Sequence, residues 1–327
     1  MPEYLIGVDL GGTRIRAALM DTDLNIIQRV ETLTQSHEGV EPTLERIKEQ
    51  VRRVMPADGS PIRGIGLSVP GPTNPERGVI INPPNLTGWR EVYLGDILHE
   101  AFDVPIYVGN DANVAALAEV ARGAARGYRH VIYITVSTGI GSGIVIDGRL
   151  ILGTTGLAAE AGHMMLHFGE GRVSSLENEA AGPDMADQAR QRIAAGESSS
   201  MADAVAGDLD AINGSTVGQA ARQGDKLALD IVSRSAMLIG LGMVNLLHLF
   251  NPQILVIGGG VSNLGDLLFG PIHETIQKYC IADDYWKDLV ITTPDLGEDV
   301  SLYGAGTLVL TQGGVVDVGE VVATIGD

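Results

Sequence analysis

A turn near the start of the sequence carries the residue types that can hold a phosphate group. Asp9, Gly11, Gly12 and Thr13 lie between two alternating apolar runs within 4–21. In a strand–turn–strand unit the backbone N–H groups converge on the turn and can bind phosphate oxygens, and glycine permits their close approach. Asp9 ends the first strand, where it can face a phosphate-bound Mg²⁺ through water, as Mg²⁺ prefers. The alternative is a plain hairpin whose glycines only make the turn.

A second segment, 131–150, repeats this design. A β-rich run leads into a turn with Thr138 and Gly139, and then into another β-rich run that ends at an Asp-Gly hairpin turn. A dinucleotide-binding fingerprint would have to open a helix, whereas these glycines lead into the apolar run 144–146. We therefore expect a loop between strands, with the Thr138 hydroxyl and N–H suited to the terminal phosphate of ATP.

The two loops need a frame of strands and helices around them. Hydrophobic periodicity predicts strands at 26–34, 62–69, 104–110, 254–260 and 288–294. It predicts helices at 41–55, 92–102, 112–126 and 301–312, and further helices through 177–250 that are interrupted by a polar piece at 196–200. Two similar phosphate loops far apart in the sequence indicate a duplicated fold around one nucleotide. The last helix is expected to pack on the first lobe.

Composition narrows the class of protein. A chain of 327 residues exceeds the usual size of a single core, so two lobes are expected. The net charge of −19 argues against binding to nucleic acid, which requires a basic surface. The single cysteine, Cys280, excludes an internal disulfide, and no secretory leader is recognisable. The apolar stretch 236–250 is predicted to be a buried helix, too short and too polar for a membrane span. A cytoplasmic enzyme is expected.

A series of short motifs occurs in order along nearly the whole sequence: DLGGT (9–13), VPGP (69–72), NPPNLTGW (82–89), GNDANVAALAE (109–119), TVSTGIGSG (135–143), EAGHM (160–164), LENEAAG (176–182) and VIGGGVS (256–262). In this set and order the sequence resembles the ROK family of sugar kinases and repressors, within the actin-like ATPase superfamily, and is most similar to its bacterial glucokinases. The resemblance implies a two-lobed α/β fold of the actin-like ATPase (ribonuclease H-like) type, with a ligand cleft between the lobes. The first lobe would comprise 1–111 with about 301–327, and the second 112–300.

The pair Asn110-Asp111 stands where an apolar strand ends and an alanine-rich helix begins. One interpretation is a simple helix cap, since Asn and Asp are favoured there. In the context of the resemblance, Asp111 is expected to be the catalytic base that accepts the proton of the sugar hydroxyl, and Asn110 to anchor a neighbouring hydroxyl. Phosphoryl transfer depends mainly on positioning and charge stabilisation. A helix N-terminus that favours an ionised aspartate is compatible with that role.

The resemblance also implies the sugar contacts. Glu160, His163 and Glu177 would bind the ring near its anomeric end, while Gly71 and Asn85 would close the other side. Carboxylates accept hydrogen bonds from hydroxyls, and histidine can donate or accept them. Glu160 and His163 are three residues apart and would share one face if their segment is helical. For Glu177 the alternative is a solvated carboxylate in the first turn of a helix.

In one place the sequence departs from the family pattern. Many members follow the histidine with a loop of three cysteines that, together with the histidine, bind a structural zinc. Here 164–177 is shorter and has no cysteine, so no zinc is expected. A replacement metal site of Glu160, His163 and His167 is the alternative, because histidines four apart on a helix can share a metal.

The glycines Gly258, Gly259 and Gly260 follow an apolar strand. They resemble the segment with which family members contact adenine and ribose, where glycine lets the base lie against the backbone. The alternative is a simple turn from strand to helix.

The sequence as a whole predicts an ATP- and Mg²⁺-dependent hexokinase that converts glucose to glucose 6-phosphate. Another substrate, such as mannose, fructose or N-acetylmannosamine, is the alternative within enzymes, and a non-catalytic sugar-sensing ROK protein is the alternative outside them. A repressor would carry an N-terminal DNA-binding module, whereas this sequence starts almost directly with a strand, so a repressor is not expected. Polyphosphate is not expected as the donor, because no basic channel is visible. The resemblance implies a homo-oligomer, a dimer or tetramer.

Overall fold

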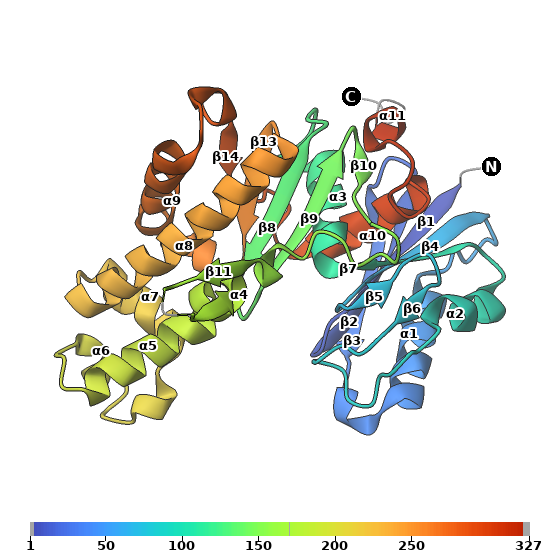
Figure 1. Ribbon diagram of the computed structural model, residues 1–327. Coiled ribbons are helices and arrows are strands. Elements are labelled where there is room, and N and C mark those ends of the chain that lie inside the picture. The colour runs from blue at the N-terminus through green and yellow to red at the C-terminus, as the bar shows by residue number, and fades with distance from the viewer. Residues whose placement is uncertain (1–2, 170, 323–327) are drawn as a thin grey trace. The chain divides into compact units, whose positions relative to one another are not determined.

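The computed structural model describes residues 3–169 and 171–322 (Figure 1). The chain divides into two compact units. Unit 1 takes in the described residues up to Tyr133, Gly143–Ala159, and those from Pro294 onward, and unit 2 takes in Ile134–Ser142 and Glu160–Thr293. The predicted lobe boundary differs from this division, because 112–133 and 143–159 belong to unit 1. The physical reason is that the helix after Asp111 packs against the last long helix of the chain.

The strands are β1 (Tyr4–Leu10), β2 (Arg14–Asp21), β3 (Ile26–Leu33), β4 (Ile62–Val69), β5 (Thr73–Asn74), β6 (Val79–Ile80), β7 (Ile106–Asn110), β8 (Val131–Val136), β9 (Ile140–Ile146), β10 (Arg149–Leu150), β11 (Met165–His167), β12 (Val173–Ser175), β13 (Ile254–Gly258) and β14 (Val290–Thr292). The α-helices are α1 (Val40–Val54), α2 (Leu94–Phe102), α3 (Asp111–Arg122), α4 (Leu176–Ala180), α5 (Gly182–Ala194), α6 (Ser200–Ala204), α7 (Gly214–Arg222), α8 (Lys226–Phe250), α9 (Asp266–Tyr279), α10 (Val300–Leu310) and α11 (Val318–Val322).

The sheet of unit 1 has the order β3-β2-β1-β4-β7. Its strands carry apolar side chains toward α1, where Ile6, Val8 and Ile47 are fully buried in one core. On the opposite face α10 lies against β1 and β4 (Figure 1). A Cβ added at Gly66 would lie 1.8 Å from the carbonyl oxygen of Ala305, so glycine is required for this close packing. The expected packing of the last helix on the first part of the chain is confirmed.

The second five-stranded sheet has the order β10-β9-β8-β13-β14. In unit 2, α8 is 25 residues long and packs against α9, α4, α5 and α7. It is long and apolar enough to cross a membrane by length and composition alone, so the prediction that it is too short is wrong. However, 67% of its most apolar window is buried inside the protein, which supports the predicted role as a buried helix.

Several elements differ from the predicted ones. The helix α9 was not predicted, since Pro271 lies inside it and proline normally ends a helix pattern. The two-stranded pairs β5–β6 and β11–β12 were not predicted either, because strands of two or three residues give no measurable alternation.

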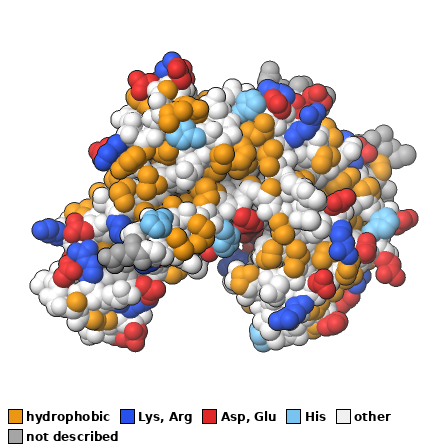
Figure 2. All heavy atoms as spheres, in the orientation of Figure 1, with side chains coloured by type: hydrophobic (Ala, Val, Ile, Leu, Met, Phe, Trp, Pro, Cys, Tyr) orange, Lys and Arg blue, Asp and Glu red, His pale blue; other side chains and the backbone are white. Residues whose placement is uncertain are grey.

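On the face drawn in Figure 2, Lys and Arg side chains are interspersed with acidic ones.

Candidate active site

Three strand ends of unit 1 bring separate parts of the candidate site together. β1, β4 and β7 run parallel, and their register pairs Asp9 with Ser68 and Val69 with Asn110. Parallel strands place their carboxyl ends at one edge of a sheet, so the turns that follow these strands leave it at the same edge. In open α/β sheets, ligands bind outside the carboxyl ends of the strands.

The turn after β1 leaves peptide groups for a ligand. Gly11 donates its N–H to the carbonyl oxygen of Arg14 at 2.9 Å, which closes the predicted hairpin. The N–H groups of Gly12 and Thr13 have no partner among the residues that the structure describes. A Cβ at Gly12 would lie 3.1 Å from Cβ of Asn85, so glycine lets Asn85 pack closely on the turn. Two open N–H groups in one turn are available to an anion.

Asp9 is paired with Arg16, which lies opposite it in the β1–β2 hairpin. Two nitrogens of Arg16 contact Oδ2 of Asp9, Nε at 2.9 Å and Nη2 at 2.7 Å. The third nitrogen, Nη1, donates to the carbonyl oxygen of Glu298 at 2.7 Å. Burial raises the pKa of the Asp9 carboxyl, and the charge and hydrogen bonds of Arg16, with a hydrogen bond from Ser301, offset part of that rise. Arg16 therefore fixes the orientation of this carboxylate.

The donor set at Asp9 fits a hydrated Mg²⁺ beside bound phosphates. Mg²⁺ keeps several waters and takes one or two carboxylates in addition to substrate phosphates. Because Oδ2 already accepts hydrogen bonds from Arg16, a contact through water leaves that ion pair intact. Within 3–169 and 171–322, no group of three or more His, Cys, Asp or Glu side chains could hold a metal by itself. The contact of Asp9 with Mg²⁺ through water stays a prediction.

The pair Asn110-Asp111 forms the junction of β7 and α3. Asn110 is the N-cap, and its Oδ1 accepts the Asn113 N–H at 2.9 Å. Asp111 is the first residue of the helix, exposed, with Oδ1 accepting the Ala112 N–H at 2.8 Å. A Cβ at Gly71 would lie 3.3 Å from Nδ2 of Asn110, so the turn after β4 lies against this junction. The cap is therefore supplied by Asn110.

In unit 2 the second loop is a turn between β8 and β9, as predicted. Ile140 donates its N–H to Oε2 of Glu177 at 2.7 Å, and a Cβ at Gly139 would lie 2.4 Å from that oxygen. Glu177 is thus half-buried and bound to the loop. It is not the fully solvated carboxylate of the alternative interpretation. The N–H groups of Thr138 and Gly139 have no partner in the described part of the chain.

The segment of Glu160 and His163 packs on the same loop. It is a single turn of 3₁₀ helix, Ala161–His163, preceded by Glu160. Ala161 donates its N–H to Oγ of Ser142 at 3.0 Å, and Ser142 is buried. The structure therefore gathers Glu160, His163 and Glu177 around the second loop within unit 2, whereas Gly71, Asn85 and Asp111 lie in unit 1.

The alternative metal site of Glu160, His163 and His167 depends on one continuous helix, and that premise is wrong. The helical turn ends at His163, and His167 lies on β11. His167 accepts the Gly169 N–H on its Nδ1 at 3.3 Å, within the β11–β12 hairpin. The two histidines therefore do not share a helix face, while the expected lack of zinc stays a prediction.

A cavity of about 670 Å³ lies beside the second loop, entirely within unit 2. Its walls come from the loop, the first turns of α5 and α7, and the 3₁₀ helix Gly260–Leu264: Ser137, Thr138, Gly182, Pro183, Met185, Ala186, Arg190, Ile212, Asn213, Gly214, Ser215, Gly218, Arg222, Gly260, Val261, Asn263 and Leu264. This volume is typical of small-molecule sites.

The cavity combines positive helix ends with cationic side chains in an otherwise acidic protein. α5 and α7 both begin at it, and a Cβ at Gly214 would lie 3.1 Å from Cα of Gly182. Arg190 and Arg222 line it and donate to the carbonyl oxygens of Ile212 and Asn263. Helix N-termini and arginines favour anionic ligands.

Only one of the three glycines after β13 lines this cavity. Gly260 does, whereas Gly258 ends β13. Gly259 has φ +86°, and a Cβ there would lie 2.3 Å from the carbonyl oxygen of Val136, so it serves close packing against β8. The segment does turn from β13 into a 3₁₀ helix that begins at Gly260, as the alternative interpretation has it, while the contact with adenine and ribose stays a prediction.

Sequence reasoning missed Arg16 and the helix residues of the cavity. The register of the hairpin could have revealed Arg16. Leu10 and Ile15 are the pair of opposite residues nearest to the turn, and Asp9 and Arg16 are the next pair. The wall from α5 and α7 gave only a weak signal, a glycine at the first position of each helix.

Comparisons with known proteins identify the family. The model of the ROK family matches residues 5–312. A glucokinase of Thermotoga maritima is 34% identical over 318 residues, which cover 94% of this chain and 98% of that protein. The xylose repressor of Caldicellulosiruptor bescii is 30% identical over 317 residues, which cover 94% of this chain and 78% of the repressor.

A solved structure gives the same answer for the fold. The crystal structure of a ROK family glucokinase from Streptomyces griseus in complex with glucose and AMPPNP is 32% identical, with a TM-score of 0.74. The match covers 93% of this chain and 98% of the Streptomyces griseus chain. It confirms the predicted fold class. The chain belongs to the ROK family.

Proposed function

We propose that this protein is an ATP-dependent sugar kinase that phosphorylates glucose. The observation that carries the proposal is an exposed aspartate at a helix N-terminus, Asp111, at the same sheet edge as a turn with two open N–H groups, those of Gly12 and Thr13. Relatives named glucokinase, and the glucokinase structure with glucose and AMPPNP, support it.

The proposed roles follow from this placement. Asp111, in the first turn of α3, accepts the proton of the attacking sugar hydroxyl. Asn110 uses Oδ1 as the helix cap, so its amide nitrogen is the group that can donate to a neighbouring hydroxyl. Asn85 and Gly71 border the same edge, and Glu160, His163 and Glu177 supply the polar contacts from unit 2.

The nucleotide occupies the cavity of unit 2, beside the turn between β8 and β9. Its base and ribose lie against Gly260, and its phosphates reach Thr138 and the positive helix ends that line the cavity. Mg²⁺, when bound, neutralises charge on the phosphates, as in other phosphoryl-transfer enzymes. Asp9, oriented by Arg16, holds its hydration shell.

A sugar panel with coupled detection of ADP tests the activity. We expect glucose to give a kcat/KM at least about tenfold above that for fructose and N-acetylmannosamine, some 1.4 kcal/mol of discrimination. A site built to hydrogen-bond particular hydroxyls penalises analogues that leave its polar groups unpaired. If an N-acetylhexosamine is best, glucose is the wrong substrate but the kinase assignment stands.

A non-catalytic sugar sensor is the second candidate, because a xylose repressor is among the relatives. The same panel separates the two. Sugar binding by calorimetry, without ADP release from any sugar in the presence of Mg²⁺, would establish the sensor and end the kinase proposal.

The proposed nucleotide site can be tested at Gly260. A Cβ there meets no atom within 4 Å and the residue lines the cavity, so a larger side chain can begin there without a clash at Cβ and take up space beside the ligand. We expect Gly260→Leu to raise the KM for ATP by about tenfold or more, with the sugar dissociation constant unchanged. The control is Gly270→Leu on α9, where an added Cβ also meets no atom within 4 Å and which does not line this cavity. An unchanged KM for ATP in Gly260→Leu would place the base elsewhere.

A further inference from the structure

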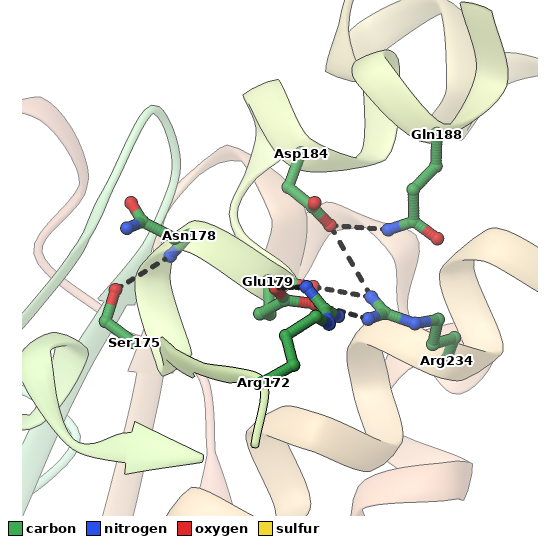
Figure 3. A network of polar contacts seen from close by, with 7 residues as sticks. All are labelled: Arg172, Ser175, Asn178, Glu179, Asp184, Gln188 and Arg234. Atoms are coloured by element: carbon green, nitrogen blue, oxygen red, sulfur yellow. Dashed lines mark hydrogen bonds and ion pairs between the residues drawn. The ribbon is translucent and has the colours of Figure 1, made fainter. Parts of the chain in front are cut away.

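An ion cluster joins the β11–β12 hairpin, which connects the candidate sugar contacts of unit 2, to α4 and α8 (Figure 3). Its centre is Glu179 of α4, whose side chain is only 7% exposed. Arg172 donates from two nitrogens to the two carboxylate oxygens, at 2.8 and 3.0 Å. Arg234 of α8 donates to Oε2 at 2.5 Å and to the backbone carbonyl oxygen of Glu179 at 2.8 Å. One residue thus ties the hairpin, α4 and α8 together.

The surroundings of Glu179 strengthen these contacts. Burial alone would raise the pKa of its carboxyl, but hydrogen bonds from Arg172, Arg234 and Ser174 outweigh burial and lower it. The carboxylate is therefore held in its charged form, and a bidentate contact between guanidinium and carboxylate is the strong kind. Phe168, at the hairpin turn, has the guanidinium carbons of Arg172 and Arg234 at 4.4 and 5.8 Å from its ring centroid. Such cation–π contacts add to the attachment of the turn.

The hairpin begins and ends at the candidate sugar contacts. Glu160 and His163 lie just before β11, and α4, which carries Glu177, follows β12 without a break. Leu176 donates its N–H to the carbonyl oxygen of Met164 at 2.9 Å, which closes the base of the hairpin. The side chain of His163 is exposed, and its ring makes no hydrogen bond among the described residues, so its position depends on the course of the backbone.

We propose that Arg172 is a positioning residue for sugar binding, which through Glu179 holds the hairpin so that Glu160, His163 and Glu177 lie in binding-competent positions. The inference rests on the proposed function of this site. When only a fraction of the molecules is competent, the apparent dissociation constant rises in inverse proportion to that fraction. A tenfold loss of the competent fraction therefore weakens sugar binding tenfold, with no change in any group that touches the sugar.

Arg172→Ala is the informative variant, because the Arg172 side chain is 56% exposed and Glu179 keeps its contact with Arg234. We expect the glucose KM and the calorimetric glucose dissociation constant to rise about tenfold or more, while the KM for ATP changes less than about threefold. The glucose KM and dissociation constant of Arg172→Lys should lie between those of the wild type and those of Arg172→Ala. The reason is that an ammonium group cannot make two parallel hydrogen bonds to one carboxylate.

The matched control is Arg192→Ala. Arg192, on α5 in the same unit, makes a bidentate contact with Glu197 at 2.8 and 2.6 Å and an ion pair with Asp230, and neither partner belongs to the hairpin. Its removal should leave the glucose dissociation constant unchanged. Hydrogen exchange of 160–178 should accelerate in Arg172→Ala and stay as in the wild type in Arg192→Ala.

Two outcomes separate the inference from the proposed function. An unchanged glucose dissociation constant in Arg172→Ala, even with a lower melting temperature, would show a purely structural ion pair and overturn the inference. If the wild-type protein phosphorylates no sugar, the kinase proposal fails, but glucose binding and hydrogen exchange still decide whether Arg172 positions the hairpin.

Discussion

Asp111→Asn is expected to lower kcat by about two to four orders of magnitude, the usual contribution of a general base. The substitution keeps the shape of the side chain and an oxygen that can accept the Ala112 N–H, now 2.8 Å from Oδ1. It removes only the group that takes the proton. Affinities for glucose and for an unreactive ATP analogue should therefore stay within a few-fold of the wild type, so the loss falls on kcat.

Asp96→Asn is the matched control, because Asp96 is exposed in the first turn of α2, in the same unit. It should leave kcat and both affinities unchanged. Turnover of Asp111→Asn within a few-fold of the wild type would remove Asp111 from the role of base. A large rise in the glucose dissociation constant would instead assign it to binding.

The main elements of the fold could be predicted because hydrophobic alternation and turn chemistry agree at each of them. The β1–β2 hairpin, β4 and α1 lie within a residue or so of their predicted bounds. Two lobes were expected from the length, but the boundary between the units could not be predicted, because it depends on which helix packs where. α3 follows the strand end at Asn110 and packs against α10, nearly two hundred residues later, and no local pattern records that contact.

The candidate site was predictable where one residue type is required at one place. Gly12 and Asp111 are such cases. The structure places Gly12 beside Asn85 and Asp111 at the N-terminus of α3. Long-range ion pairs are different. Glu179 meets Arg234, 55 residues away, and either residue alone looks like an ordinary charge on a helix surface. The same holds for the wall of the cavity, whose one weak signal is the glycine at the first position of α5 and of α7.

Glu119 shows the largest stability effect that we expect from a single charged residue. It is fully buried on α3 and accepts three backbone N–H groups, those of Ala124 at 2.7 Å, Asp295 at 3.2 Å and Leu296 at 3.4 Å. Glu119→Ala leaves these donors without their acceptor. Because a buried unsatisfied group costs about 1–3 kcal/mol, and these donors lie on half-buried or exposed residues, the free energy of unfolding should fall by about 1–3 kcal/mol.

The control for this variant is Glu49→Ala, since Glu49 is an exposed glutamate in the middle of α1, in the same unit. Denaturant unfolding should show a loss of less than about 0.5 kcal/mol for it. A comparably small loss for Glu119→Ala would mean that water or a backbone shift satisfies the three N–H groups at little cost.

The pH dependence of Glu119→Gln gives a sharper test of the same site. Burial raises the pKa of the Glu119 carboxyl above its ordinary value, although the hydrogen bonds from Ala124, Asp295 and Leu296 offset part of the rise. The folded state then binds the proton more tightly than the unfolded state. The stability contributed by this group is complete below the ordinary glutamate pKa and is lost as pH rises through the raised folded value. The stability advantage of the wild type over Glu119→Gln should therefore narrow with rising pH across that window. An advantage that widens with pH would show that the three N–H donors outweigh burial and lower this pKa.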